Sequence, residues 1–251
     1  MNEHREYRYR CRCSDTVIVF THGILGSPLQ FEDMVEKLGG SYSVENLLLP
    51  GHGKTIKEFR RSGMAEWQAY VDERVRLLQR DYKNIVLVGH SMGCLLSIQT
   101  AVSYPLNIKG LFLTALPLFV HFGVPYLKNI FTVGFSRDIC NPVVAASRRL
   151  NSVSVSNPFE YLKGSMRYIE LLNKIRASRE LLRELNVPVM VLHSARDVVV
   201  SEKTLRFIDE NSPDIRYEVL RDSGHFYYPA GDRERALSLF VDFISGLNRA
   251  E

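Results

Sequence analysis

The feature that most restricts the fold is a change of pattern within residues 84–94, NIVLVGHSMGC. The run at 85–88 is short and wholly apolar, which is typical of a central parallel strand covered on both faces. A hydroxyl residue, Ser91, then stands between two glycines, and a helical pattern follows to about residue 104. These residues predict a strand, a tight turn and a helix in direct succession. The turn either serves the fold alone, with Ser91 incidental, or presents Ser91 as a nucleophile.

The same alternation of short apolar runs and amphipathic stretches covers most of the 251 residues. Strands are predicted at 17–20, 84–89, 108–115, 187–194 and 215–220, and another strand is predicted to end at NLLLP, residues 46–50. Helices are predicted at 28–38, 64–82, 92–104 and 236–247. Repeated strand–helix units predict an α/β fold with a doubly wound, mostly parallel sheet. One large domain of this class fits the chain length.

One long stretch, residues 116–186, interrupts the alternation, because it has no convincing strand. It contains an apolar and aromatic part followed by a helical part, and it is too long for an ordinary connection. We therefore expect a helical cap at 116–186 inserted into a core formed by 1–115 and 187–251. Packing within the core, or a helix lying on a membrane surface, are the alternatives for the apolar part.

Charge and cysteine content limit the partners. The net charge of +4 is small and scattered, which argues against a nucleic-acid partner. Arginines alternate with other residues in HREYRYRCRC, residues 4–13, which predicts a half-buried strand with Cys11 and Cys13 on one face. The alternative is that residues 4–13 form a strip that binds phosphate or a membrane. The four cysteines show no zinc-ligand spacing and are expected to be reduced.

Targeting signals are equally sparse. The N-terminus lacks the apolar segment of a signal peptide, and no run of 18 apolar residues occurs. We therefore expect a cytoplasmic protein without stable membrane insertion. The sequence makes no prediction of oligomeric state.

A serine hydroxyl becomes a good nucleophile only when a base removes its proton and a third group orients that base. Candidates should lie in loops after later strands. Asp197 follows the strand at 187–194, and His225 follows the strand at 215–220. Asp222 is a rival for the acid, but it shares the loop of His225 and would have to fold back.

Five segments in order resemble landmarks of the α/β-hydrolase family: FTHGILGS, LLPGHGKT, GHSMG, SARDVVV and DSGHF. Within that family the chain is most similar to cytosolic carboxylesterases and enzymes like monoacylglycerol lipase. Ala195 departs from the family, which often has glycine there. GHGKT is not a nucleotide-binding loop, because Leu48 stands where that motif needs glycine.

The resemblance implies a role for each residue. Ser91 would attack an acyl carbonyl, His225 would move the proton and Asp197 would orient the imidazole. The backbone amides of Ile24 and Met92 would form the oxyanion hole.

Other residues near the predicted site are assigned to structure. His22 and His52 are expected to hydrogen-bond loop backbone, and His90 to pack or hydrogen-bond beside the turn. Cys94 is expected to be a small buried residue of the helix. No cofactor or metal is expected.

The expected function is cleavage of a small-molecule carboxylic ester, with short or medium acyl chains or monoacylglycerols as substrates. Phe119, Phe122 and Tyr126 favour an apolar acyl group. The motifs do not distinguish esters from thioesters, amides, lactones or carbon–carbon bonds. A ligand receptor that binds without turnover is the alternative from another class.

Overall fold

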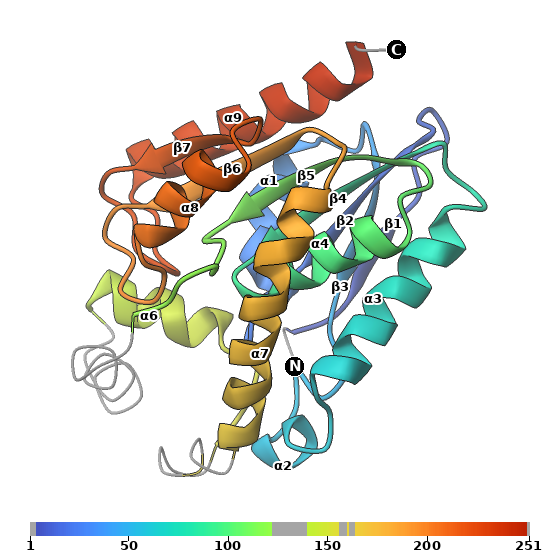
Figure 1. Cartoon of the computed structure of the whole chain (residues 1–251). Helices are drawn as coiled ribbons and strands as arrows, with labels where there is room; N and C mark the ends of the chain where they lie inside the picture. The colour runs from blue at the N-terminus through green and yellow to red at the C-terminus, as the bar shows by residue number, and fades with distance from the viewer. Residues whose placement is uncertain (1–3, 122–139, 156–159, 161–163, 250–251) are drawn as a thin grey trace.

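The computed structural model describes residues 4–121, 140–155, 160 and 164–249. A seven-stranded sheet with the strand order β1-β3-β2-β4-β5-β6-β7 forms its centre (Figure 1). The strands are β1 (Tyr7–Tyr9), β2 (Thr16–Thr21), β3 (Ser43–Leu47), β4 (Asn84–His90), β5 (Ile108–Thr114), β6 (Val189–Ser194) and β7 (Arg216–Leu220). Only β1 runs antiparallel to its neighbour, and all other pairs are parallel. The predicted doubly wound, mostly parallel sheet is confirmed.

Helices cover both faces of the sheet. They are η1 (Pro28–Phe31), α1 (Glu32–Lys37), α2 (Ile56–Phe59), α3 (Met64–Leu78), α4 (Met92–Ser103), α6 (Pro142–Leu150), α7 (Ser165–Leu181), η3 (Leu182–Glu184), α8 (Lys203–Asn211) and α9 (Ala230–Arg249). The helices α1 and α9 lie on one face, and α3, α4, α7 and α8 lie on the other (Figure 1). None of these described helices is both long and apolar enough to span a bilayer.

The central strand β4 explains the uninterrupted apolar run of the sequence. Ile85 and Leu87 pack into the core layer of α3 and α4, whereas Val86 and Val88 pack into the layer of α9. Successive side chains of a strand point to opposite faces, so a strand covered twice needs apolar residues at every position.

Two predictions of local structure are wrong. The helix expected at 28–38 is divided into η1 and α1, because Phe31 leaves helical geometry (φ −116°, ψ 9°) and buries its ring 5.1 Å from that of Phe20. The N-terminal strand ends at Tyr9, and Cys11 is buried whereas Cys13 is exposed. The two thiols therefore do not share a strand face.

The stretch between β5 and β6 contains α6, α7 and η3 in its described part, with no named strand there. The helix α7 packs along α3 and α4 beside the sheet. The division into a core and a cap at 116–186 stays a prediction. Phe122 and Tyr126, which favoured an apolar substrate, lie outside the described residues.

Candidate active site

Ser91 occupies a strained turn between β4 and α4. Its backbone has φ 52° and ψ −121°, a conformation that non-glycine residues rarely adopt and that costs about 1–3 kcal/mol. The Ser91 amide donates to the carbonyl of Thr114 on the neighbouring strand at 3.0 Å, which helps to hold the turn. The side chain is thereby fixed at the carboxyl edge of the sheet, at the start of α4.

The two glycines of the turn are required by close backbone contacts. A Cβ at Gly93 would lie 1.9 Å from the carbonyl oxygen of Thr21, and one at Gly89 would lie 2.7 Å from the backbone of Cys94. The turn is therefore packed directly against β2 and the first turn of α4. The glycines serve the fold and the presentation of Ser91 together.

Asp197 and His225 meet at the same edge. Asp197 follows β6, His225 follows β7, and His225 Nδ1 donates to Asp197 Oδ2 at 2.8 Å. Both residues are buried. The other carboxylate oxygen of Asp197 accepts from the amides of Val199 and Val200 at 2.7 and 2.9 Å. The carboxylate is thus held by three donors, and the imidazole keeps its proton on Nδ1.

The environment keeps Asp197 ionised. Burial opposes its charge, but the neighbouring His225 and the two amides outweigh burial and lower the pKa of Asp197 below its ordinary value. The rival acid, Asp222, instead forms an exposed ion pair with Arg196 at 2.5 Å. Of the two carboxylates, only Asp197 forms a hydrogen bond or ion pair with His225 among the residues that the structure describes.

The loop after β2 brings a backbone amide toward the Ser91 turn. A Cβ at Gly23 would lie 3.1 Å from Ser91 Cβ, so the loop and the turn are in contact. The Gly23 carbonyl accepts from the Gly26 amide at 3.0 Å and from His22 Nδ1 at 2.8 Å. In a trans peptide the next N–H points the opposite way. Two donors on this carbonyl therefore fix the direction of the Ile24 amide.

The second predicted donor, the Met92 amide, begins α4 and so has no acceptor within its own helix. Across the described parts of the chain, neither this amide nor that of Ile24 donates a hydrogen bond to protein. Both amides therefore remain candidates for the predicted oxyanion hole. The positive end of the α4 dipole adds to the attraction.

Two buried histidines support the loops around this edge. His22 donates through Nδ1 to Gly23 and accepts from the Leu49 amide at Nε2, 3.1 Å away. His52 Nδ1 lies 3.2 Å from the carbonyl oxygen of Pro50. Burial lowers the pKa of His52 to about 4 and that of His22 well below its ordinary value. Both rings are neutral near pH 7, and these hydrogen bonds are to loop backbone.

The segment after α6 also contacts the loop after β2, which contains Gly23 and Ile24. The Ser152 amide donates to the carbonyl of Leu25 at 2.8 Å, and the Ser152 hydroxyl contacts the carbonyl of Gly26. The Ser154 amide donates to the backbone carbonyl of Lys54 at 2.9 Å. Leu25 itself has a positive φ of 59°. Residues from the predicted cap therefore brace the strained turn of the candidate oxyanion loop.

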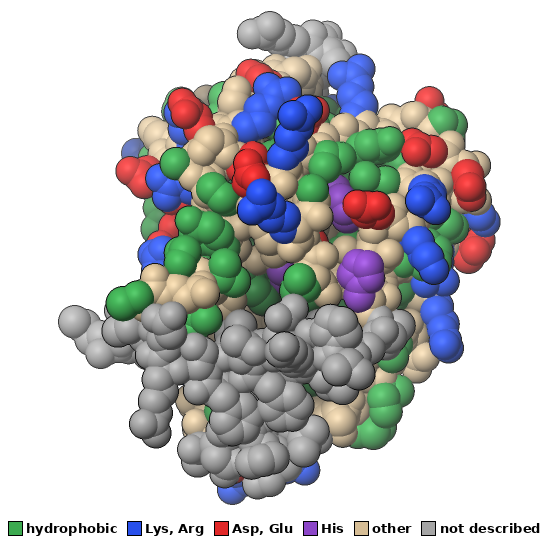
Figure 2. Space-filling model, turned by 90° about the vertical axis from the view of Figure 1, so that its left-hand side faces the viewer, with side chains coloured by type: hydrophobic (Ala, Val, Ile, Leu, Met, Phe, Trp, Pro, Cys, Tyr) green, Lys and Arg blue, Asp and Glu red, His purple; other side chains and the backbone are tan. Residues whose placement is uncertain are grey.

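A hollow of about 280 Å³ lies beside Asp197 and is lined in part by His121, His193 and Arg206. It opens on the side to which the parallel strands point, and Figure 2 shows histidine side chains reaching the surface of that side. Burial lowers the pKa of His193. No group of three or more potential metal ligands exists among the residues that the structure describes.

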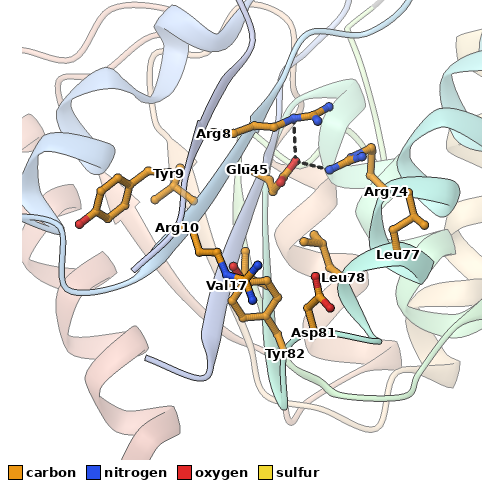
Figure 3. Close-up of a pocket in the computed structure, with 11 residues that line it drawn as sticks. Arg8, Tyr9, Arg10, Val17, Glu45, Arg74, Leu77, Leu78, Asp81 and Tyr82 are labelled. Carbon is orange, nitrogen blue, oxygen red and sulfur yellow. Dashed lines mark hydrogen bonds and ion pairs between the residues drawn. The ribbon is translucent and has the colours of Figure 1, made fainter. Parts of the chain in front are cut away.

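A larger hollow, about 400 Å³, lies at the other end of the sheet, near the start of β2 (Figure 3). Glu45 accepts from Arg8 at 3.2 Å and from Arg74 at 2.9 Å across it. Arg8 of the N-terminal segment is thus paired with a carboxylate. All three residues of β1 are exposed, so the prediction of a half-buried strand there is wrong. This hollow contains none of the candidate catalytic residues.

Comparison with known proteins agrees with this architecture. The family model described as "Alpha/beta hydrolase family" matches residues 18–237. Lipase 3 of Moraxella sp. (strain TA144) is 24% identical over 226 residues, 83% of this chain and 71% of that protein. The pimeloyl-[acyl-carrier protein] methyl ester esterase of Legionella pneumophila (strain Corby) is 22% identical over 217 residues, 83% of this chain and 87% of that protein.

A solved structure reported for the metagenome-derived lipolytic enzymes LipS and LipT has the same fold. Its TM-score is 0.72 at 21% sequence identity, and the match covers 97% of this chain and 98% of that chain. At this identity the likeness concerns the fold.

Proposed function

Because this chain belongs to the α/β-hydrolase family and is a hydrolase resembling esterases and lipases, we propose that it cleaves carboxylic esters through an acyl-enzyme on Ser91. The observation that carries the proposal is the hydrogen bond from His225 to Asp197 at the sheet edge that also holds the strained Ser91 turn. A fold alone hosts many activities, so the assignment rests on these residues.

The proton on His225 Nδ1 determines the direction of transfer. Since Nδ1 donates to Asp197, the lone pair of the neutral imidazole is on Nε2. Nε2 accepts the proton of Ser91 as Oγ bonds to the ester carbonyl carbon. The same proton then passes to the leaving alkoxide, which departs as an alcohol. Asp197 stabilises the imidazolium between these two steps.

The second half of the reaction repeats the sequence with water. His225 Nε2 removes a proton from water while the oxygen attacks the acyl carbon of the Ser91 ester. The bond to Oγ breaks, Ser91 regains the proton, and the carboxylic acid leaves. The negative oxygen formed in both steps is held by the amides of Ile24 and Met92.

The side chains around the loop favour an apolar acyl group. Ile24 and Leu25 are half-buried against the core cluster that also contains Val153 and Met92. The relative named as a lipase agrees with such substrates, whereas the Legionella relative is named for a methyl ester carried on an acyl-carrier protein. The proposal therefore names small-molecule esters of apolar acids as the substrate class, with cytoplasmic location as an additional prediction.

A series of p-nitrophenyl esters of increasing acyl length tests the proposal, together with labelling by a fluorophosphonate. We expect turnover by the natural chain, covalent labelling of Ser91 found by peptide mapping, and loss of both in Ser91→Ala. Full turnover by Ser91→Ala, or a label on another residue, would refute the assignment. Labelling of Ser91 without turnover of any ester would favour a thioester, amide or lactone substrate, or the receptor function.

A further inference from the structure

Three hydrogen bonds connect the candidate oxyanion loop to the loop of the candidate base. The Gly23 amide donates to Gln30 Oε1 at 3.0 Å. Gln30 Nε2 lies 3.2 Å from His90 Nδ1, and His90 Nε2 lies 3.0 Å from the carbonyl oxygen of His225. These residues come from four separate places in the chain. The chain of contacts passes through His90, the residue directly before Ser91.

The direction of every bond in this chain is determined by chemistry. The His225 carbonyl can only accept, so His90 Nε2 must carry the proton. His90 Nδ1 is then a lone pair and accepts from the Gln30 amide nitrogen. The remaining oxygen of Gln30 accepts from Gly23. Each donor meets an acceptor, and turning the Gln30 amide over would set a donor against the Gly23 N–H and the oxygen against the Nδ1 lone pair.

We propose that Gln30 and His90 are positioning residues that hold the oxyanion loop and the His225 loop in register with Ser91. The inference rests on the proposed function, since it assigns these loops their roles. Gln30 fixes the peptide that precedes Gly23, and His90 fixes the backbone of His225. Loss of the chain of bonds therefore weakens stabilisation of the oxyanion and orientation of the base together.

The surroundings of His90 agree with this role. The residue is 5% exposed, and its ring lies 5.0 Å from the ring of His225, centroid to centroid. Burial, followed by the nearness of His225, lowers the pKa of His90 to about 3. A neutral His90 keeps its Nδ1 lone pair for Gln30, and it also adds no positive charge beside His225 when that ring accepts the Ser91 proton.

Three variants each remove a different part of this chain of hydrogen bonds. Gln30→Met keeps the length of the side chain and removes both amide contacts. His90→Gln places an amide near the position of Nε2, so it can still donate to His225 but no longer reaches Gln30. His90→Asn does the reverse, because its amide lies near the position of Nδ1. We expect each variant to fold and to lose no more free energy of unfolding in urea than the control described below.

For each variant we expect kcat to fall about tenfold, the rate equivalent of about 1.4 kcal/mol and the size of one neutral hydrogen bond. KM should stay within about twofold, because the oxyanion exists only in the transition state. In the double variant Gln30→Met, His90→Gln the losses should not multiply, since either change already breaks the same chain.

Gln79→Met is the matched control. Gln79 also joins two segments through its amide, donating to the carbonyls of Tyr104 and Leu106 at 2.9 and 2.6 Å. These segments lie before β5, at the opposite end of the sheet. We expect Gln79→Met to lower the free energy of unfolding and to leave kcat unchanged.

The outcomes separate the two proposals. If fluorophosphonate fails to label Ser91 in the natural chain, the proposed function and this inference are both overturned. If Ser91 is labelled and esters are cleaved, but Gln30→Met keeps the natural kcat, only the inference is overturned. Losses that multiply in the double variant would also overturn it, because the two residues would then act independently.

Discussion

Acid should destabilise this protein through histidines that are buried in neutral form. His52 packs between the rings of His22, Phe59 and Trp67, with centroids 4.7–5.2 Å apart. Its pKa is lowered from 6.5 to about 4 by burial. Because the unfolded chain binds this proton more tightly, stability is full above pH 6.5 and is lost as the pH falls toward 4.

The size of the effect follows from the two pKa values. Between pH 7.5 and 5, the unfolded chain gains nearly all of its proton at this site and the folded chain gains little, which costs about 2 kcal/mol. His90, with a pKa lowered to about 3, adds about 2 kcal/mol by the same reasoning. Together they remove about 4 kcal/mol from a typical stability of about 5–15 kcal/mol.

The variant His52→Phe isolates one of these contributions. A phenyl ring keeps the aromatic contacts, and the Pro50 carbonyl still accepts from Trp67 Nε1 at 2.9 Å. Urea unfolding of both proteins at pH 7.5, 6 and 5 should show that the variant loses about 2 kcal/mol less than the natural chain between the extremes. Equal pH dependence in the two proteins would refute the reasoning, because His52 would then not be the buried neutral group described.

Three further outcomes are expected. Gly93→Ala should cost at least about 3 kcal/mol or prevent folding, because its Cβ would lie 1.9 Å from the Thr21 carbonyl, as measured by soluble yield and urea unfolding. Asp197→Asn should lower kcat about 10⁴-fold with the fold retained, and near-natural kcat in ester assays would contradict its role. Burial lowers the pKa of Lys174 from 10.5 to about 8, so this side chain binds its proton more weakly in the folded than in the unfolded protein. The free energy of unfolding should therefore rise by about 3 kcal/mol as the pH increases from 8 to 10.5. That rise should be absent in Lys174→Met, and urea unfolding at the two pH values compares them.

The sheet was predictable because its signal is local. A central parallel strand must be apolar on both faces, and residues 85–88 show that pattern without reference to the rest of the chain. The helix at 28–38 was predicted as one piece because its apolar spacing is helical throughout. Burial of Phe31 against Phe20 divides it, and that contact depends on a strand that the helix pattern does not contain.

The candidate site was also predictable only in part. Asp197 and His225 could be selected from their positions after successive strands, because the carboxyl ends of parallel strands meet at one edge. Gln30 was missed, since a glutamine in an amphipathic stretch looks like any solvated polar residue. No local pattern shows that its amide is flanked by Gly23 on one side and His90 on the other.

Strand order explains why these distant residues converge. The strands β2 and β4 are neighbours in the sheet, so the loop after β2 lies beside the turn after β4. The loop of His225 follows β7, three positions from β4, and must reach back across the edge to this turn. A loop that extends so far needs an attachment near its tip, and the bond from His90 to the His225 carbonyl is one. His90 is well placed for this attachment, because it is the last residue of β4 and so lies at the same sheet edge as Ser91.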